Sequence, residues 1–209
     1  TKAFLGQMLV LYLLCTKLSY EQKSINKKDY QKKIKDLLSL SKSAKNTLNI
    51  EDKIQTLGKD FANSKGSMFL GRGYSYPIAL EGALKLKELA YVHAEGYPAG
   101  EMKHGPLALI EEGMPVVVIA PRDEHYKKTI SNMQEVISRG AKVLLITNKS
   151  TDEIYSENIW EQIEVDAISD ELIPFLTTIP LQKLAYYSAL DKGYDIDKPR
   201  NLAKSVTVE

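Results

Sequence analysis

Short β-rich runs recur along the chain after Gly66 and constrain the fold more than any other feature. Four of them are SMFLGRG, MPVVVIAP, AKVLLIT and WEQIEV. A continuous apolar run such as VVVIA is typical of a strand that is buried on both faces of a parallel sheet. Segments with helical spacing lie between these runs, at about 76–95, 124–139 and 171–192. This alternation predicts an α/β fold in which a doubly wound, mostly parallel sheet is flanked by helices.

In an open sheet of this kind, ligands bind beyond the carboxyl ends of the strands. This rule directs attention to the loops after Leu70, Ala120 and Thr147. The first of these loops, GRGYSYP, places two glycines and a serine at a strand-to-helix turn, where backbone amides can bind a phosphate or carboxylate. A tight turn needs glycine for its own geometry, so the sequence leaves both interpretations open.

Composition excludes several classes of function. The 209 residues are 44% hydrophobic and 26% charged, as in a globular protein with one good core. Lys and Arg (28) nearly balance Asp and Glu (27), so there is no electrostatic reason to expect a nucleic-acid partner. One cysteine and three scattered histidines form neither a disulfide nor a zinc pattern. We predict a cytoplasmic protein with no metal site and no cofactor.

The first 65 residues differ in character from the rest. The apolar run AFLGQMLVLYLLC spans about 13 residues and contains Gln7, which is too short for a bilayer span, and no membrane partner is predicted. The chain opens without methionine inside this helix-like run, so we expect a piece of a longer polypeptide. Residues 17–65 are polar with apolar residues at helical spacing, which predicts two or three amphipathic helices. They form either a connector or a helical bundle of their own.

Charged residues alternate along one face of the helix expected at 76–95. At about 100° per residue, Glu81, Lys85 and Glu88 fall within a sector of roughly 60°. An exposed helix stabilised by i,i+3 and i,i+4 ion pairs explains this pattern. A second explanation is proton transfer, which a carboxylate beside a lysine can perform in a cleft that excludes water. The sequence does not show which face of this helix is exposed to solvent.

Two further candidates lie outside this helix. His104 lies in AEGYPAGEMKHGP, where glycines and prolines favour an ordered loop, and histidine suits proton transfer near neutral pH. A single histidine in a loop is more often structural, so that alternative stays open. Near the end of the chain, Lys204 stands among Leu202, Ala203, Val206 and Val208, so its amine could be partly desolvated. The alternative is a terminal strand or plug with one snorkelling lysine.

Two stretches carry a resemblance to a known family. GRGYSYPIALEGALKLKELAYVHAEGYPAGEMKHGPLALI and the ending KPRNLAKSVTVE resemble the second sugar-isomerase (SIS) domain and the tail of the glutamine–fructose-6-phosphate aminotransferases, or glucosamine-6-phosphate synthases. GEMKHGP alone is typical of the SIS superfamily, whereas the LEGALKLKE helix together with RNLAKSVTVE narrows the resemblance to this family. The opening TKAF is similar to the last part of the first SIS domain, so the resemblance covers essentially the whole chain.

Members of this family make glucosamine 6-phosphate from fructose 6-phosphate and glutamine. The resemblance implies that Lys204 forms a Schiff base with the open-chain ketose, which requires a free amine of the kind that burial favours by lowering the lysine pKa. It implies that Glu88 moves a proton between C1 and C2. It also implies that His104 opens the sugar ring from the partner subunit of a homodimer.

The resemblance assigns supporting roles to the remaining candidates. Lys85 and Glu81 match charged neighbours that assist proton traffic at the sugar hydroxyls, and Ala203 joins Lys204 in contacting the substrate. The sugar-phosphate loops of the first SIS domain and the catalytic cysteine of the glutaminase half have no equivalent here. We therefore expect the chain alone to be inactive.

The resemblance also predicts the domain organisation. Residues 1–51 would be the end of a preceding SIS domain and a helical connector, 52–195 an SIS domain, and 196–209 an active-site tail. Two other functions stay open: a non-catalytic sugar-phosphate sensor and a structural dimerisation module. A deglycase or ketose isomerase on the same fold is a further alternative, although its tail should not end in this decapeptide.

Overall fold

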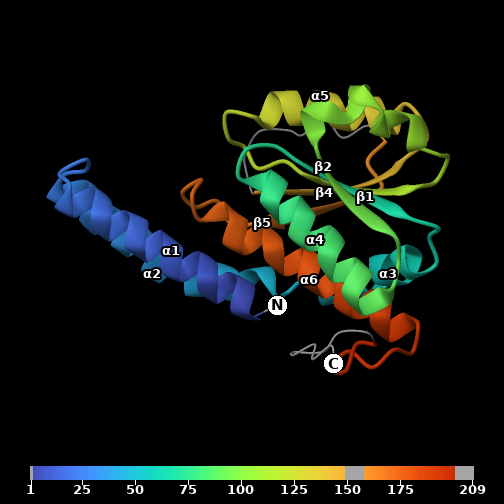
Figure 1. The fold of residues 1–209 in the computed structure, drawn as a ribbon, viewed down its shortest axis with the longest axis horizontal. Helices are drawn as coiled ribbons and strands as arrows, with labels where there is room; N and C mark the ends of the chain where they lie inside the picture. The colour runs from blue at the N-terminus through green and yellow to red at the C-terminus, as the bar shows by residue number, and fades with distance from the viewer. Residues whose placement is uncertain (1, 149–157, 201–209) are drawn as a thin grey trace, which may run out of the picture.

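The computed structural model describes residues 2–148 and 158–200, and its ribbon is drawn in Figure 1. Its helices and strands follow in chain order: α1 (Lys2–Glu21), α2 (Lys27–Thr47), α3 (Glu51–Ala62), β1 (Ser67–Gly71), α4 (Ser75–Ala90), β2 (Ala94–Pro98), the 3-10 helices η1 (Ala99–His104) and η2 (Pro106–Leu109), β3 (Pro115–Ile119), α5 (Tyr126–Ile137), β4 (Lys142–Asn148), β5 (Glu161–Val165) and α6 (Ile173–Asp191).

The strands form a five-stranded sheet in the order β2-β1-β3-β4-β5, and every neighbouring pair is parallel. All five residues of both β1 and β3 are buried, as the apolar runs predict. Strand β2 lies on one side of β1, and β3 lies on its other side. The direction in which successive strands are added therefore reverses at β1. The predicted doubly wound α/β fold is confirmed.

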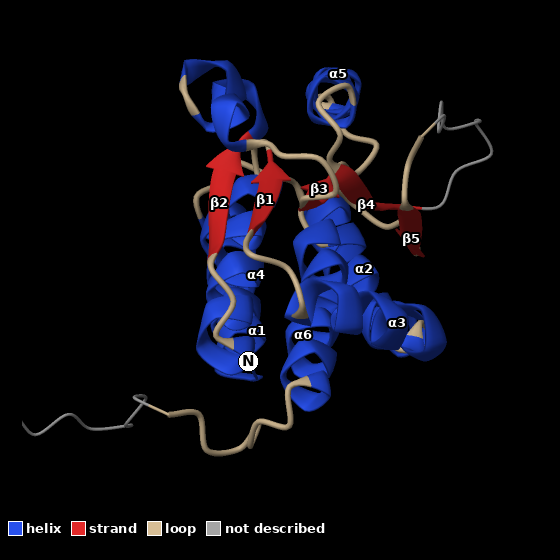
Figure 2. Ribbon diagram, turned by 90° about the vertical axis from the view of Figure 1, so that its right-hand side faces the viewer, coloured by secondary structure: helices blue, strands red, loops and turns tan. Residues whose placement is uncertain are grey.

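Helices cover both faces of the sheet. Helices α3, α4 and α6 lie on one face, while α5 and the 3-10 helices lie on the other (Figures 1 and 2). Successive strand residues alternate between these two cores, because side chains of a strand point to opposite faces. Val117 and Leu144 belong to the core under α4 and α6, whereas Val118 and Leu145 belong to the core under α5.

One segment differs from the sequence prediction. The helix expected over 76–95 ends at Ala90, and residues 94–98 form the edge strand β2 rather than a loop. The run AEGYP contains glycine, proline and glutamate, which are poor strand formers. Pairing with β1, from Ser67 opposite Ala94 to Gly71 opposite Pro98, overrides this weak local preference.

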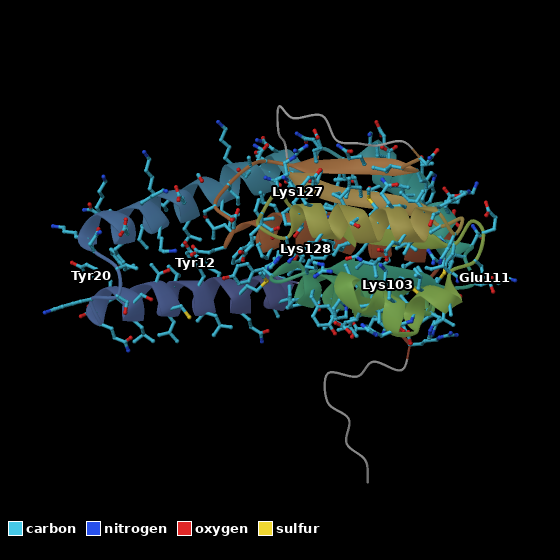
Figure 3. All side chains as sticks on the ribbon, turned by 90° about the horizontal axis from the view of Figure 1, so that it is seen from above. Tyr12, Tyr20, Lys103, Glu111, Lys127 and Lys128 are labelled. Atoms are coloured by element: carbon cyan, nitrogen blue, oxygen red, sulfur yellow. The ribbon has the colours of Figure 1, made fainter. Side chains whose placement is uncertain are left out.

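Helix α1 lies beside α2, and the pair extends away from the sheet (Figures 1 and 3). Only Thr16 of α1 is buried, and six of its large apolar residues are exposed: Leu9, Val10, Leu11, Leu13, Leu14 and Leu18. The 20-residue helix is long and apolar enough to cross a bilayer, so the 13-residue run underestimated its length. This is weak support for a span, because helices that pack against other protein surface share this character.

Helix α4 approaches β2 very closely at one point. A Cβ atom added to Gly96 would lie 2.9 Å from Leu80 Cα, so glycine is required for this contact. We expect Gly96→Ala to lower the free energy of unfolding of the 209-residue chain by about 1–3 kcal/mol, because the backbone would have to shift. Urea unfolding followed by circular dichroism measures this change.

Gly6 provides the matched control. It lies within α1 with no other atom within 4 Å of an added Cβ. Gly6→Ala should therefore leave the stability unchanged or raise it by up to about 1 kcal/mol. Equal stability of the Gly96→Ala variant and the parent would contradict the account of how α4 is placed.

Candidate functional site

Helix α4 carries the charged stripe that the sequence predicts. Its apolar face packs into the core through Ile78, Ala79, Ala83 and Leu86. The stripe lies on the flank of this face and is neither fully buried nor exposed. The side chains of Glu81, Lys85 and Glu88 are 10%, 13% and 25% exposed, respectively. An ordinary solvent-exposed ion-pair ladder does not account for this degree of burial.

The lysine stands between the two carboxylates. Lys85 Nζ donates a short hydrogen bond to Glu88 Oε2 and lies 3.8 Å from Glu81 Oε1. Spacings of three and four residues place all three side chains on adjacent turns of one helix flank. The three groups together carry one net negative charge when all are ionised. This arrangement can hold or relay protons, and it favours a cation brought next to it.

Glu81 is the group whose ionisation the surroundings alter most clearly in this stripe. Burial raises the pKa of the Glu81 carboxyl above its ordinary value of 4.5. Lys85 opposes this rise in pKa, and the nearby negative charge of Glu88 adds to it. A carboxyl with a raised pKa exchanges protons closer to neutral pH, as a proton-transfer site requires.

His104 lies at the end of η1, on the opposite face of the sheet from α4. The 3-10 helix packs beside α5, where Lys103 Nζ lies 3.0 Å from Glu135 Oε1 (Figure 3). The imidazole is 74% exposed, and its Nε2 lies 3.8 Å from Glu101 Oε2. Within one chain the structure therefore does not bring His104 to the α4 stripe.

The carboxyl-terminal segment runs back to the end of α4. Tyr91, which caps α4, accepts a hydrogen bond of 2.6 Å from the Arg200 backbone N–H. The Arg200 guanidinium lies 4.1 Å from the centroid of the Tyr91 ring. The ring centroids of Tyr91 and Tyr194 are 4.8 Å apart. Lys204 and Ala203 lie outside the described residues.

The sequence did not single out Tyr91, Tyr194 or Arg200. Tyrosine and arginine at these positions carry no periodic signal, because the residues meet only through the tertiary path of the chain. The sole hint was that Arg200 belongs to the ending KPRNLAKSVTVE.

Two backbone amides of the GRGYSYP loop donate hydrogen bonds within the loop itself. Ser75 N–H and Tyr76 N–H donate to the carbonyls of Arg72 and Gly73, at 2.9 and 3.2 Å. A Cβ added to Gly71 would lie 2.3 Å from the Ser75 carbonyl oxygen, so close chain packing explains this glycine. Arg72 donates to Asn132 Oδ1 at 2.9 Å. The anion-binding interpretation therefore gains nothing from these contacts.

The part of the chain that the structure describes contains no group of three or more His, Cys, Asp or Glu side chains placed to hold a metal ion.

The raised pKa of Glu81 predicts a pH dependence of stability. Between the unfolded value near 4.5 and the higher folded pKa, the folded state binds more protons than the unfolded state. The free energy of unfolding contributed by Glu81 therefore falls as the pH rises through this window. Glu81→Gln should remove this fall, so the variant becomes progressively more stable relative to the parent as the pH rises from about 4.5 through the raised folded pKa.

Urea unfolding of both chains at several pH values measures this difference. Glu164 is exposed on β5, so Glu164→Gln controls for the loss of one carboxylate. A constant difference in stability between Glu81→Gln and the parent over this pH range would contradict the assigned pKa direction.

Comparisons with known proteins add the family. The chain is 50% identical over 209 residues to a glutamine–fructose-6-phosphate aminotransferase (isomerizing) of Bacteroides thetaiotaomicron, and 46% identical over 209 residues to that of Aquifex aeolicus. Each alignment covers all of this chain and 34% of the relative, so the chain spans about a third of the length of these relatives.

Solved structures agree with the sequence comparisons. The C-terminal domain of the glucosamine-fructose-6-phosphate aminotransferase from Francisella tularensis superposes with a TM-score of 0.91 and 40% identity, covering 95% of this chain and 56% of that one. A tagatose-6-phosphate ketose/aldose isomerase from Escherichia coli, at 20% identity and a TM-score of 0.65 over 78% of this chain and 46% of that one, shares the fold alone. The SIS domain model matches residues 60–191, and the chain belongs to the SIS domain family.

Proposed function

We propose that this chain is the carboxyl-terminal third of an aminotransferase that converts fructose 6-phosphate and glutamine-derived ammonia into glucosamine 6-phosphate. The half-buried stripe of Glu81, Lys85 and Glu88 carries this proposal. Its support is identity of 44–50% over the full chain with relatives that bear the aminotransferase name.

Lys204 supplies the nucleophile in the proposed reaction. Its free amine attacks C2 of the open-chain ketose, and the ketone oxygen leaves as water, which gives a cationic iminium. Ammonia then replaces the lysine amine on C2, and Lys204 is released. Neither step needs an oxidant or a reductant.

Glu88 performs the proton transfer between the two carbons. The iminium acidifies the C1–H bond, so a carboxylate can take that proton and give an enolamine. Return of a proton to C2 leaves an aldehyde at C1 and the amine on C2, which is glucosamine 6-phosphate. The bond from Lys85 holds the Glu88 carboxylate in place, while Glu81 and Lys85 handle protons at the sugar hydroxyls.

His104 opens the sugar ring from a partner subunit in this proposal. Within one chain His104 is not brought to the α4 stripe, because η1 and α4 lie on opposite faces of the sheet. A role for His104 at this stripe therefore requires a second copy of the chain. A homodimer could bring the exposed imidazole of one copy to the α4 stripe of the other. The glutaminase domain and the sugar-phosphate loops would lie in the remaining two thirds of the polypeptide.

The isolated 209-residue chain should not form glucosamine 6-phosphate from glutamine and fructose 6-phosphate. It holds the proposed carboxylates and lysine but neither a glutaminase nucleophile nor the phosphate-binding loops of the preceding domain. Product formation assayed by mass spectrometry checks this expectation, with a full-length aminotransferase carrying this chain as positive control. Glutamine-dependent turnover by the isolated chain would refute the division of labour proposed here.

Borohydride trapping tests the proposed role of Lys204 in the full-length enzyme. Incubation with fructose 6-phosphate, reduction and digestion should place the added sugar mass on Lys204, because borohydride reduces the iminium to a stable amine. Lys204→Arg keeps the charge but cannot form the iminium, so it should yield no adduct. Tight substrate binding without any adduct on Lys204 would favour a non-catalytic sugar-phosphate sensor.

A further inference from the structure

Charge is distributed unevenly between the two parts of the chain. Residues 1–50 contain ten lysines and three acidic residues, which gives this part a net charge of +7. The whole chain carries +1, so the remaining 159 residues carry −6. The near-neutral total therefore conceals a basic arm, which consists of α1 and α2. This arm extends away from a domain of net negative charge (Figures 1 and 3).

Four lysines form a row along one face of α2. At about 100° per residue they fall within a sector of roughly 80° around the helix axis. The lysine row consists of Lys28, Lys32, Lys35 and Lys42. All four residues are exposed, and none of them forms an ion pair in the part of the chain that the structure describes. Lys33, by contrast, lies outside this sector, and its Nζ donates to Glu171 Oε1 at 2.6 Å.

The lysine row differs from the charged stripe on α4, where lysine alternates with glutamate. Lys32 lies four residues after Lys28 and three before Lys35, and like charges at these spacings destabilise a helix. Asp29 and Asp36 are the acidic residues of α2, and among the described contacts neither pairs with the row. The row therefore does not stabilise its own helix, whereas its concentrated positive charge suits a negatively charged partner.

Leu38 lies at the edge of the same row, about 40° from Lys42 around the helix axis. Its side chain is 76% exposed, more than any other large apolar residue that the structure describes. Helices that pair with one another combine an apolar contact with ion pairs along its flank. An exposed leucine beside a row of unpaired lysines matches one side of such a pair. The complementary side is a helix that carries carboxylates and an apolar residue.

A nucleic acid fits this face less well than a protein does. Proteins that bind single strands stack the bases on aromatic side chains and use arginine as well as lysine. Helix α2 contains no arginine, and its one aromatic residue is Tyr30. The Tyr30 ring already stacks on Tyr20 of α1, with 4.6 Å between the ring centroids. Phosphate groups would also leave Leu38 without an apolar contact.

We propose that the outer face of α2 binds an acidic helix of a partner protein, with carboxylates opposite the lysine row and an apolar residue against Leu38. Each ion pair at such an exposed surface contributes little by itself, so the affinity depends on several of them acting together. Salt should weaken the complex, because it screens exposed charges. This interaction does not depend on the proposed aminotransferase activity.

Isothermal titration calorimetry with the 209-residue chain tests this proposal. The probe is a helical peptide of 21 residues, the length of α2, with four glutamates and one leucine on one face. The row variant combines Lys28→Gln, Lys32→Gln, Lys35→Gln and Lys42→Gln. It should bind the peptide at least about tenfold more weakly than the parent. Leu38→Ala should weaken binding several-fold, because it removes the apolar contact.

The matched control removes four exposed lysines that lie outside the arm. It combines Lys59→Gln, Lys65→Gln, Lys127→Gln and Lys128→Gln. This variant has the same net charge as the row variant and should bind the peptide as the parent does. Circular dichroism should show equal helix content in all variants, because every changed residue is exposed. An equal loss of binding in both quadruple variants would reduce the effect to general charge attraction and overturn the proposal.

Other occupants of the lysine row give different results. Tighter binding of a single-stranded RNA than of the peptide would assign the row to nucleic acid and overturn the proposal. Self-association of the chain without peptide, lost in the row variant, would assign the row to a second copy. Peptide binding by the full-length aminotransferase would support a separate partner. Binding by the 209-residue chain alone would mean that the rest of the polypeptide covers the row. No binding by the parent chain would refute the proposal outright.

Discussion

The close packing of α4 between the sheet and α6 is the constraint on which the candidate site depends. A Cβ at Gly82 would lie 2.8 Å from Leu181 Cδ1 and 2.9 Å from Phe69 Cδ1, while Gly96 lets β2 reach the α4 backbone. These two glycines fix the rotation of α4 about its own axis. A rotation of one residue, about 100°, would move the charged stripe into the core or into solvent.

The fixed rotation of α4 explains why the stripe of Glu81, Lys85 and Glu88 is suited to proton transfer. Partial burial weakens the competition of water, so the charges of Glu81, Lys85 and Glu88 act on one another and on a bound ligand more strongly than exposed charges would. The single excess negative charge suits the proposed iminium, which carries a positive charge next to the C–H bond that is to be broken. Electrostatic stabilisation of this kind is commonly a large part of catalysis.

The tail adds the second half of the proposed machinery. Lys204, which lies outside the described residues, supplies the amine in the proposed reaction. The Tyr91–Arg200 contact offers a physical reason for a tyrosine in a left-handed backbone at the end of the same helix. Helix α4 therefore carries the proposed carboxylates, and its end also contacts Arg200 in the described part of the chain.

Sequence patterns predicted the parallel sheet because its central strands are apolar on both faces. They also placed Glu81, Lys85 and Glu88 on one flank, because helical spacing is a local property. They could not show that this flank is half-buried, since its burial depends on elements that are distant in sequence. Strand β2 was missed because pairing with β1, not its own composition, makes AEGYP extended. The Tyr91–Arg200 contact joins positions 109 residues apart and left no local signal.

The central claim is that Glu88 breaks the C1–H bond of the C2 iminium that forms when ammonia replaces Lys204 on the sugar. The most direct measurement follows fructose 6-phosphate labelled with deuterium at C1 in the full-length aminotransferase and in its Glu88→Gln variant. The parent should remove label from C1, and Glu88→Gln should retain it while still forming the borohydride-trapped adduct on Lys204. Loss of label from C1 in Glu88→Gln at the parent rate would contradict the account.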